Sequence, residues 1–225
     1  MFTGSVETVG IVSRLEGVSD GAQIEIYAPE FGRDLALGDT VLVNGAVLNI
    51  AAFERGAFVA DVSIETLDRT SIGNVRPQDK VNLERSLRLS DRLAGSFVTG
   101  HVDGLGILRQ RHVSGNATIY QFEIPENIVP YLIENGTITI EGVSLSIARM
   151  KDNMIAVSVA PIIEQTTILP LIEYDAYVNI EVDLIAKYVR RFTVGNEENA
   201  HNLDDYNAQD SNAPLSAKLR NFLDN

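Results

Sequence analysis

The sequence contains an internal repeat. Five short motifs of the first half recur in the second half, in the same order and at an offset of 96 or 97 residues. The pairs are Thr3–Glu7 with Thr99–Asp103, Gly10–Val12 with Gly106–Leu108, Gly45–Ile50 with Gly142–Ile147, Thr70–Ile72 with Thr166–Ile168, and Val81–Glu84 with Val178–Glu181. One such match would be weak, but five at a nearly constant offset predict two superimposable structural units.

Each half also carries the pattern of short β-strands. Apolar and polar residues alternate, as in strands with one buried face, over Gln23–Tyr27, Thr40–Val43, Ala57–Val62 and Thr137–Ile140. Glycine, asparagine and aspartate cluster between such runs, as expected of turns. Several short strands at close spacing within about 95 residues favour a small closed barrel. We therefore predict an all-β chain with one barrel in each half.

The remaining segments predict helices and a change of character near the end of the chain. Short helices are expected after Pro29 and after Pro125, and residues 81–91 are expected to join the barrels. Apolar residues at helical spacing predict a helix over residues 184–192. Residues 195–213 are polar and acidic, which is typical of a linker, and residues 214–223 predict a second short helix. The expected domains are a barrel at 1–90, a barrel at 97–185, and the helical and acidic segment 186–225.

Composition excludes several classes of function. The 225 residues carry a net charge of −13, which disfavours nucleic acid and anionic lipid as partners. There is no cysteine, so disulfides, thiolate metal sites and a cysteine nucleophile are excluded. No apolar run reaches the length of a membrane span, and the first residues lack the pattern of a secretory signal. We expect a cytoplasmic protein that binds neither membrane nor nucleic acid.

Four motifs give the chain a specific resemblance to a known family. Met1–Gly4, Asn82–Arg85, Thr99–Asp103 and Asn179–Asp183 are similar to riboflavin synthase, and the similarity extends from residue 1 to about 192, almost without gaps. The resemblance implies two six-stranded Greek-key β-barrels in tandem, followed by a C-terminal helix. It also implies a homotrimer that binds 6,7-dimethyl-8-ribityllumazine, one molecule per barrel, with the productive site between barrels of neighbouring subunits. In that reaction one molecule transfers a four-carbon unit to the other, which yields riboflavin and 5-amino-6-ribitylaminouracil without metal or redox cofactor.

The resemblance further implies which residues form the site. Catalytic roles fall on His101, Ser144 and Asp183. Ligand contacts are expected from Thr40, Asn49, Gly100, Gly142, Ser146, Thr166 and Thr167. Hydroxyl groups suit a ribityl chain because each can both donate and accept hydrogen bonds. Most of these residues belong to the second half, so the second barrel is expected to hold the tighter site, with His101 grouped beside Ser144.

Several positions depart from the family's pattern. The family's cysteine in the first barrel is replaced by Val47, and a second histidine is replaced by Ser96. The family's usual lysine before the second barrel's central strand is replaced by Asn135. If the missing histidine carries a proton in the family, its loss would slow turnover by roughly 10²–10⁴. Structural roles are the alternative for two retained residues, namely a local hydrogen bond for His101 and a helix cap for Asp183.

These substitutions leave three functions open. The first is a riboflavin synthase with an altered first barrel, and the intact joining motifs favour it. The second is a non-catalytic protein that binds a lumazine or flavin, which the joint loss of thiol, imidazole and ammonium groups favours. The third is a family member with different chemistry on another substrate. Incubation with the ribityl-lumazine separates them, because absorbance reports both binding and conversion.

Overall fold

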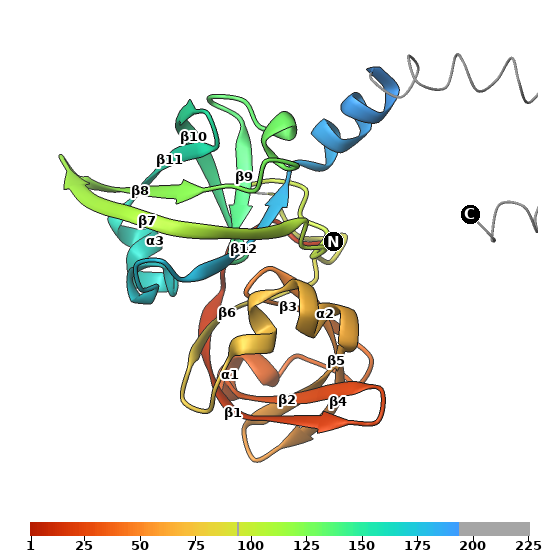
Figure 1. The fold of residues 1–225 in the computed structure, drawn as a ribbon. Coiled ribbons are helices and arrows are strands. Elements are labelled where there is room, and N and C mark those ends of the chain that lie inside the picture. Colours follow the sequence, from red (N-terminus) through yellow and green to blue (C-terminus); the bar gives the residue numbers. More distant parts are fainter. Residues whose placement is uncertain (94, 194–225) are drawn as a thin grey trace, which may run out of the picture. The chain divides into compact units, whose positions relative to one another are not determined.

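The structure, a computed structural model, describes residues 1–93 and 95–193. The first barrel is built from six strands: β1 (Thr8–Val18), β2 (Gly21–Tyr27), β3 (Thr40–Val43), β4 (Ala46–Glu54), β5 (Ala57–Ser63) and β6 (Lys80–Arg85). They close as an antiparallel barrel in the order β1-β2-β5-β4-β3-β6 (Figure 1). Because β3, β4 and β5 pair in sequence while β2 lies beside β5, the connection is a Greek key. Two short helices, α1 (Pro29–Gly32) and α2 (Ile64–Arg69), and the 3₁₀ turn η1 (Ser71–Asn74) complete this half.

The second barrel repeats the first, as the sequence predicts. Its strands are β7 (Gly104–Ser114), β8 (Ala117–Glu123), β9 (Thr137–Ile140), β10 (Val143–Lys151), β11 (Met154–Val159) and β12 (Tyr177–Val182). They close in the equivalent order, with α3 (Pro161–Thr166) in the place of α2 and the 3₁₀ turns η2 (Val129–Tyr131) and η3 (Leu169–Leu171). The irregularities are repeated as well. The register shifts after Val12 in β1 and after Leu108 in β7, and again after Ile50 in β4 and Ile147 in β10.

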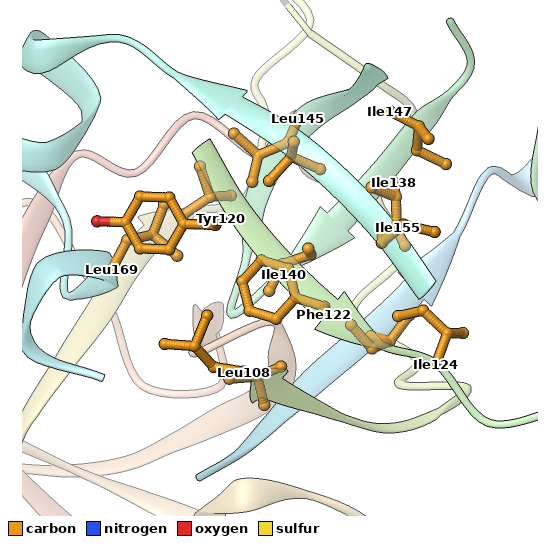
Figure 2. Packing of buried hydrophobic residues seen from close by; sticks show 14 of the residues in the cluster. Leu108, Tyr120, Phe122, Ile124, Ile138, Ile140, Leu145, Ile147, Ile155 and Leu169 are labelled. Atoms are coloured by element: carbon orange, nitrogen blue, oxygen red, sulfur yellow. The ribbon is translucent and has the colours of Figure 1, made fainter. Parts of the chain in front are cut away.

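Each barrel has its own hydrophobic core, formed by the residues that point inward along every strand. In β8, for example, Thr118, Tyr120 and Phe122 are buried and alternate with less buried neighbours. Figure 2 shows the core of the second barrel, in which Tyr120 and Phe122 stack with ring centroids 6.3 Å apart. Burial of such side chains contributes about 1.5–3 kcal/mol each, so the two cores account for much of the stability of the fold.

The two barrels contact each other through paired hairpin turns. The β3–β4 turn places Asn44 and Gly45 at positive φ, and the β9–β10 turn does the same with Glu141 and Gly142. A Cβ added to either glycine would lie 2.8 Å from the backbone nitrogen of the other, so only glycine fits at this contact. Two buried amides complete it, because Asn82 donates to the carbonyl of Glu141 and Asn179 donates to the carbonyl of Asn44.

The structure confirms most of the predicted elements and changes two of them. Residues 80–85 form β6 of the first barrel, so the connection between barrels begins after Arg85 rather than at residue 81. The expected helix after Pro125 is only the 3₁₀ turn η2. The C-terminal helix covers residues 184–193, and the expected linker and terminal helix at 195–223 lie outside the described residues. Both barrels belong to one compact unit that ends at Leu184, and a second unit begins at Ile185.

Candidate functional site

The segment that precedes each barrel reaches across to the other barrel. We call residues 2–5 the first arm and residues 98–103 the second arm. The carbonyl of Gly4 in the first arm accepts a hydrogen bond from the backbone nitrogen of Ser144 in β10, at 2.8 Å. The carbonyl of Gly100 in the second arm accepts one from Val47 in β4, at 3.0 Å. Each arm therefore borders the site of the barrel that it does not belong to.

A buried glutamate fixes each arm at its base. Glu84 accepts hydrogen bonds from the backbone and the hydroxyl of Thr3 and from the backbone of Gly4, over 2.7–3.0 Å. Glu181 binds Thr99 and Gly100 in the same way, over 2.7–2.9 Å. Burial raises the pKa of Glu84 above its ordinary value, and the hydrogen bonds from Thr3 and Gly4 oppose this shift. The repeated Asn-x-Glu of β6 and β12 is thus the structural basis for the position of both arms.

This exchange places His101 at the first barrel. The sequence grouped His101 with Ser144, but the structure places it beside Val47, at a cavity of about 190 Å³ whose lining also includes Glu65, Thr66 and Arg69. The imidazole is exposed to solvent, and its Nδ1 lies 3.1 Å from the hydroxyl of Thr99. That hydrogen bond orients the ring without burying it. The local bond and a role toward a ligand are therefore compatible.

A second cavity adjoins the first on the same barrel. It measures about 440 Å³ and shares Val47 and Thr66 with the cavity at His101. Its polar lining includes Asn49 on β4 and Asp61 and Ser63 on β5, together with Ser19 and Asp20 of the β1–β2 turn. Ser63 also accepts a hydrogen bond from the backbone of Thr66 and caps α2, which fixes the helix that borders both cavities. We call this combined surface the barrel-1 face.

The equivalent surface of the second barrel carries fewer polar groups. The hydroxyl of Ser144 lies 2.8 Å from that of Ser96, a residue of the connection between the barrels. Ser146 pairs across the ladder with Thr137, whose hydroxyl donates to Asp183 at 2.8 Å. At the 97-residue offset, however, Asp61, Ser63 and Thr66 of the barrel-1 face become Ser158, Ala160 and Ile163.

The remaining predicted residues occupy varied positions. Thr40 on β3 lies opposite Asn49 on β4, and Thr137 on β9 holds the equivalent position in the second barrel. Gly100 is in the second arm, whereas Gly142 is buried in the hairpin turn between the barrels. Asp183 directly precedes the helix at 184–193.

The threonine pair at the end of α3 needs a correction in register. Thr167 is buried, its hydroxyl donates to the carbonyl of Ile163, and it matches Thr70, whose hydroxyl donates to Thr66. The offset here is therefore 97 residues rather than the 96 inferred from the sequence. Thr166 is exposed, and its hydroxyl donates to the carbonyl of Ile162. Both hydroxyls thus bind carbonyl groups of α3, and a ligand contact from either residue stays a prediction.

Several polar residues of the barrel-1 face were not identified from the sequence, among them Asp61, Ser63, Glu65 and Thr66. The available signal was a serine directly before a helical run, which is an N-capping pattern. A capping pattern indicates a helix start and not a ligand site. Among the residues that the structure describes, no cluster of three or more histidine and carboxylate side chains could hold a metal ion. In the same part of the chain, no helix is long and apolar enough to cross a membrane.

Comparisons with known proteins agree with the two-barrel fold. The family model of the lumazine binding domain matches twice, over residues 3–86 and 99–183. Riboflavin synthase of Actinobacillus pleuropneumoniae is 36% identical over 192 residues, which cover 85% of this chain and 89% of that protein. Riboflavin synthase of Bacillus subtilis is 33% identical over 199 residues, covering 88% and 93%. A crystal structure of LumP with riboflavin superimposes with a TM-score of 0.75 at 24% identity, covering 81% and 99%, which is a likeness of fold.

Proposed function

This chain belongs to the lumazine-binding domain family, and we propose that it binds 6,7-dimethyl-8-ribityllumazine and converts it to riboflavin and 5-amino-6-ribitylaminouracil. The observation that carries the proposal is the barrel-1 face, where the second arm brings an exposed imidazole to a cavity lined by hydroxyl, amide and carboxylate groups. A ribityl chain needs several such partners, because each of its hydroxyls both donates and accepts. Curated riboflavin synthases at 33–38% identity support the same reaction.

In this proposal the protein contributes positioning and proton transfer. Two lumazine rings must be held together, since a well-oriented pair reacts far faster than two free molecules. His101 is the proton carrier at the barrel-1 face, and Ser144, Ser146 and Asp183 bind the second molecule at the other barrel. Thr40 and Asn49 contact the ribityl chain at the first barrel. No metal or redox cofactor enters the proposal.

The proposal includes assembly as a homotrimer in the cytoplasm. One chain carries both faces, and the reaction needs two rings in contact, so faces from neighbouring subunits would have to meet. The helix at 184–193 offers an apolar surface for such an assembly, since Tyr188 and Val189 are both more than half exposed. Light scattering of the purified chain checks this. A mass near that of a single chain, 24.6 kDa, at micromolar concentration would contradict it.

A non-catalytic binding protein is the second candidate, and Val47 is the observation that favours it. Val47 lines both cavities of the barrel-1 face, where an aliphatic side chain can neither donate nor accept a proton. The family member recruited to another substrate remains as a third candidate.

One assay separates the candidates. The purified chain is mixed with the ribityl-lumazine, and absorbance follows binding and riboflavin formation. We expect slow turnover that His101→Ala lowers by at least about 100-fold, whereas His112→Ala, at an exposed histidine on β7, leaves it unchanged. Val47→Cys should raise the rate about tenfold, which corresponds to about 1.4 kcal/mol of barrier.

The outcomes distinguish the three functions. Binding without conversion, with no activity gained in Val47→Cys or in the double variant Val47→Cys, Ser96→His, would establish the binding protein. Failure to bind the lumazine at all would leave only the third candidate. Ordinary turnover that persists in His101→Ala would overturn the role given to this histidine.

A further inference from the structure

A groove between the two barrels is separate from the surfaces described so far. Its volume is about 740 Å³, and none of its lining residues belongs to the two cavities of the barrel-1 face. Sites for small molecules in proteins commonly measure about 300–1,000 Å³. The groove is thus large enough for a ligand of its own.

The two walls of the groove are the same positions of the two repeats. The backbone nitrogen of Ser71 donates to the side chain of Asn179, and that of Ile168 donates to the side chain of Asn82, at 2.7 and 2.8 Å. This reciprocal pair fixes η1 and η3 against the opposite barrels in equivalent ways. Any difference between the walls therefore lies in the side chains and not in the backbone.

The side chains of the two walls differ in character at four equivalent positions. The wall from the first barrel is polar, with Ser71, Asn74, Asp79 and Lys80. At an offset of 97 residues, the wall from the second barrel carries Ile168, Leu171, Ala176 and Tyr177. Leu171 is 56% exposed and Tyr177 is 59% exposed, so this wall leaves apolar surface open to solvent. A molecule with one apolar face and one polar edge would satisfy both walls.

Two side chains from the paired hairpin turns also line the groove. Glu141 is only 2% exposed, and its Oε1 accepts hydrogen bonds from the backbone of Asn179 at 2.6 Å and from the hydroxyl of Ser71 at 3.1 Å. Its Oε2 has only a long contact of 3.5 Å with that hydroxyl. Burial raises the pKa of Glu141 to about 8, so the carboxyl is mostly protonated at neutral pH and its O–H is a donor. Its counterpart in the repeat, Asn44, lines the groove beside it.

The charges around the groove select against anions. Asp79 and Glu173 contribute two carboxylates, while Lys80 contributes one ammonium group, which leaves a net charge of −1 with Glu141 protonated. The negative charge of the groove would repel a phosphorylated ligand. The groove therefore fits an uncharged molecule better than a nucleotide of similar size.

We propose that the groove between the barrels is a second binding site, which takes an uncharged planar heteroaromatic molecule. Its ring lies along Leu171 and Tyr177, and its polar edge faces Ser71, Asn74 and Glu141. The site is independent of the ribityl-lumazine site at the barrel-1 face and does not require turnover.

Equilibrium dialysis with riboflavin as the uncharged probe, and with flavin mononucleotide as its anionic counterpart, tests the proposal. The groove variant is Leu171→Ser, Tyr177→Ser, in which both side chains are more than half exposed and the fold should persist. The matched control is Tyr27→Ser, at a tyrosine of similar exposure outside the groove. The barrel-1 variant is Asn49→Ala, Asp61→Ala. Circular dichroism verifies that every variant is folded.

We expect riboflavin to bind each chain at one site more than the two barrels provide, and this additional site is the groove. The groove variant should weaken that site at least tenfold, while the control and the barrel-1 variant leave it intact. Flavin mononucleotide should bind there at least tenfold more weakly than riboflavin. Unchanged binding in the groove variant, loss of all binding in the barrel-1 variant, or no riboflavin binding anywhere would each overturn the proposal. Equal affinity for the two probes would overturn its assignment to uncharged ligands.

A negative result in the riboflavin-binding experiment does not contradict the proposed function. Conversion of the ribityl-lumazine is measured separately by absorbance, and it depends on His101 and Val47 rather than on the groove.

Discussion

Replacing Glu141 by asparagine should remove a pH dependence from the stability of the protein. Glu141 and Asn44 hold equivalent places in the paired hairpin turns, and both have positive φ. The side chain of each also accepts a hydrogen bond from the backbone nitrogen of an asparagine. Asn179 in β12 donates to Glu141 at 2.6 Å, and Asn82 in β6 donates to Asn44 at 2.7 Å. The first barrel thus already shows that asparagine fits this turn. Glu141→Asn keeps the acceptor and deletes the titrating group.

The size of the effect follows from the pKa of Glu141. Burial raises it to about 8 in the folded chain, against an ordinary value of 4.5. The folded state therefore holds a proton that the unfolded state releases above pH 4.5. This stabilisation is complete below pH 4.5 and is lost as the pH rises toward 8. Between pH 5 and pH 7 the loss is roughly 2–3 kcal/mol, at about 1.4 kcal/mol per unit.

Urea unfolding at pH 5, 6, 7 and 8 measures this dependence. We expect the free energy of unfolding of Glu141→Asn minus that of the parent chain to increase by roughly 2–3 kcal/mol between pH 5 and pH 7, because only the parent loses stability over this range. Glu126→Asn, at an exposed glutamate of the same barrel, should run parallel to the parent. Glu84, whose pKa is also raised, titrates in all three proteins and cancels in the comparison. Parallel pH profiles for Glu141→Asn and the parent would refute the reasoning.

Three further outcomes test the fold and the site. Gly142→Ala should destabilise the chain by at least about 2 kcal/mol in urea unfolding. Residue 142 has a positive φ, and the added Cβ would meet the backbone nitrogen of Gly45. Unchanged stability would contradict the close approach of the two turns. Tyr120→Phe removes the hydroxyl that donates to Glu164 at 2.7 Å and should lower the free energy of unfolding by about 1–2 kcal/mol, measured as a lower Tm. An unchanged Tm would show that this hydrogen bond does not stabilise the fold. Asn49→Ala should weaken lumazine binding more than the double change Ser144→Ala, Ser146→Ala, because the barrel-1 face has more polar partners. Isothermal titration calorimetry measures both affinities. The reverse order would make the second barrel the tighter site.

The fold could be predicted from the sequence because local pattern and internal repeat agree. Strand alternation gave the inward positions of β2, β3, β5 and β9, and the offset of 96 or 97 residues extended them to both halves. The boundary at β6 was missed because the alternating run through Arg85 is continuous with the polar connection that follows. A strand end is set there by pairing with β1 and β3, which the local pattern does not contain.

The site was harder to predict, because it depends on how the two repeats contact each other. Aligning the halves assigned His101 to the second barrel, since it follows the second copy of the Thr-Gly motif. In the structure the second arm crosses to β4, so the same alignment gives the wrong neighbour. Only the repeat partner of a residue, and not its spatial partner, can be recognised from a single sequence. The polar pair of Tyr120 and Glu164 was missed for a similar reason, because Ile24 and Leu67 occupy its place in the first half.

The exchanged arms also bear on how a two-barrel chain of this kind can arise. A single repeat contains its own arm, but the strand that this arm borders belongs to the other repeat, as Gly4 on β10 and Gly100 on β4 show. Two separate copies of one repeat could satisfy each other by trading arms, which is the arrangement of a domain-swapped dimer. Joining the copies end to end converts that bimolecular exchange into an intramolecular one. The tandem chain is therefore a covalent form of a swapped pair, in which fusion frees each copy to diverge.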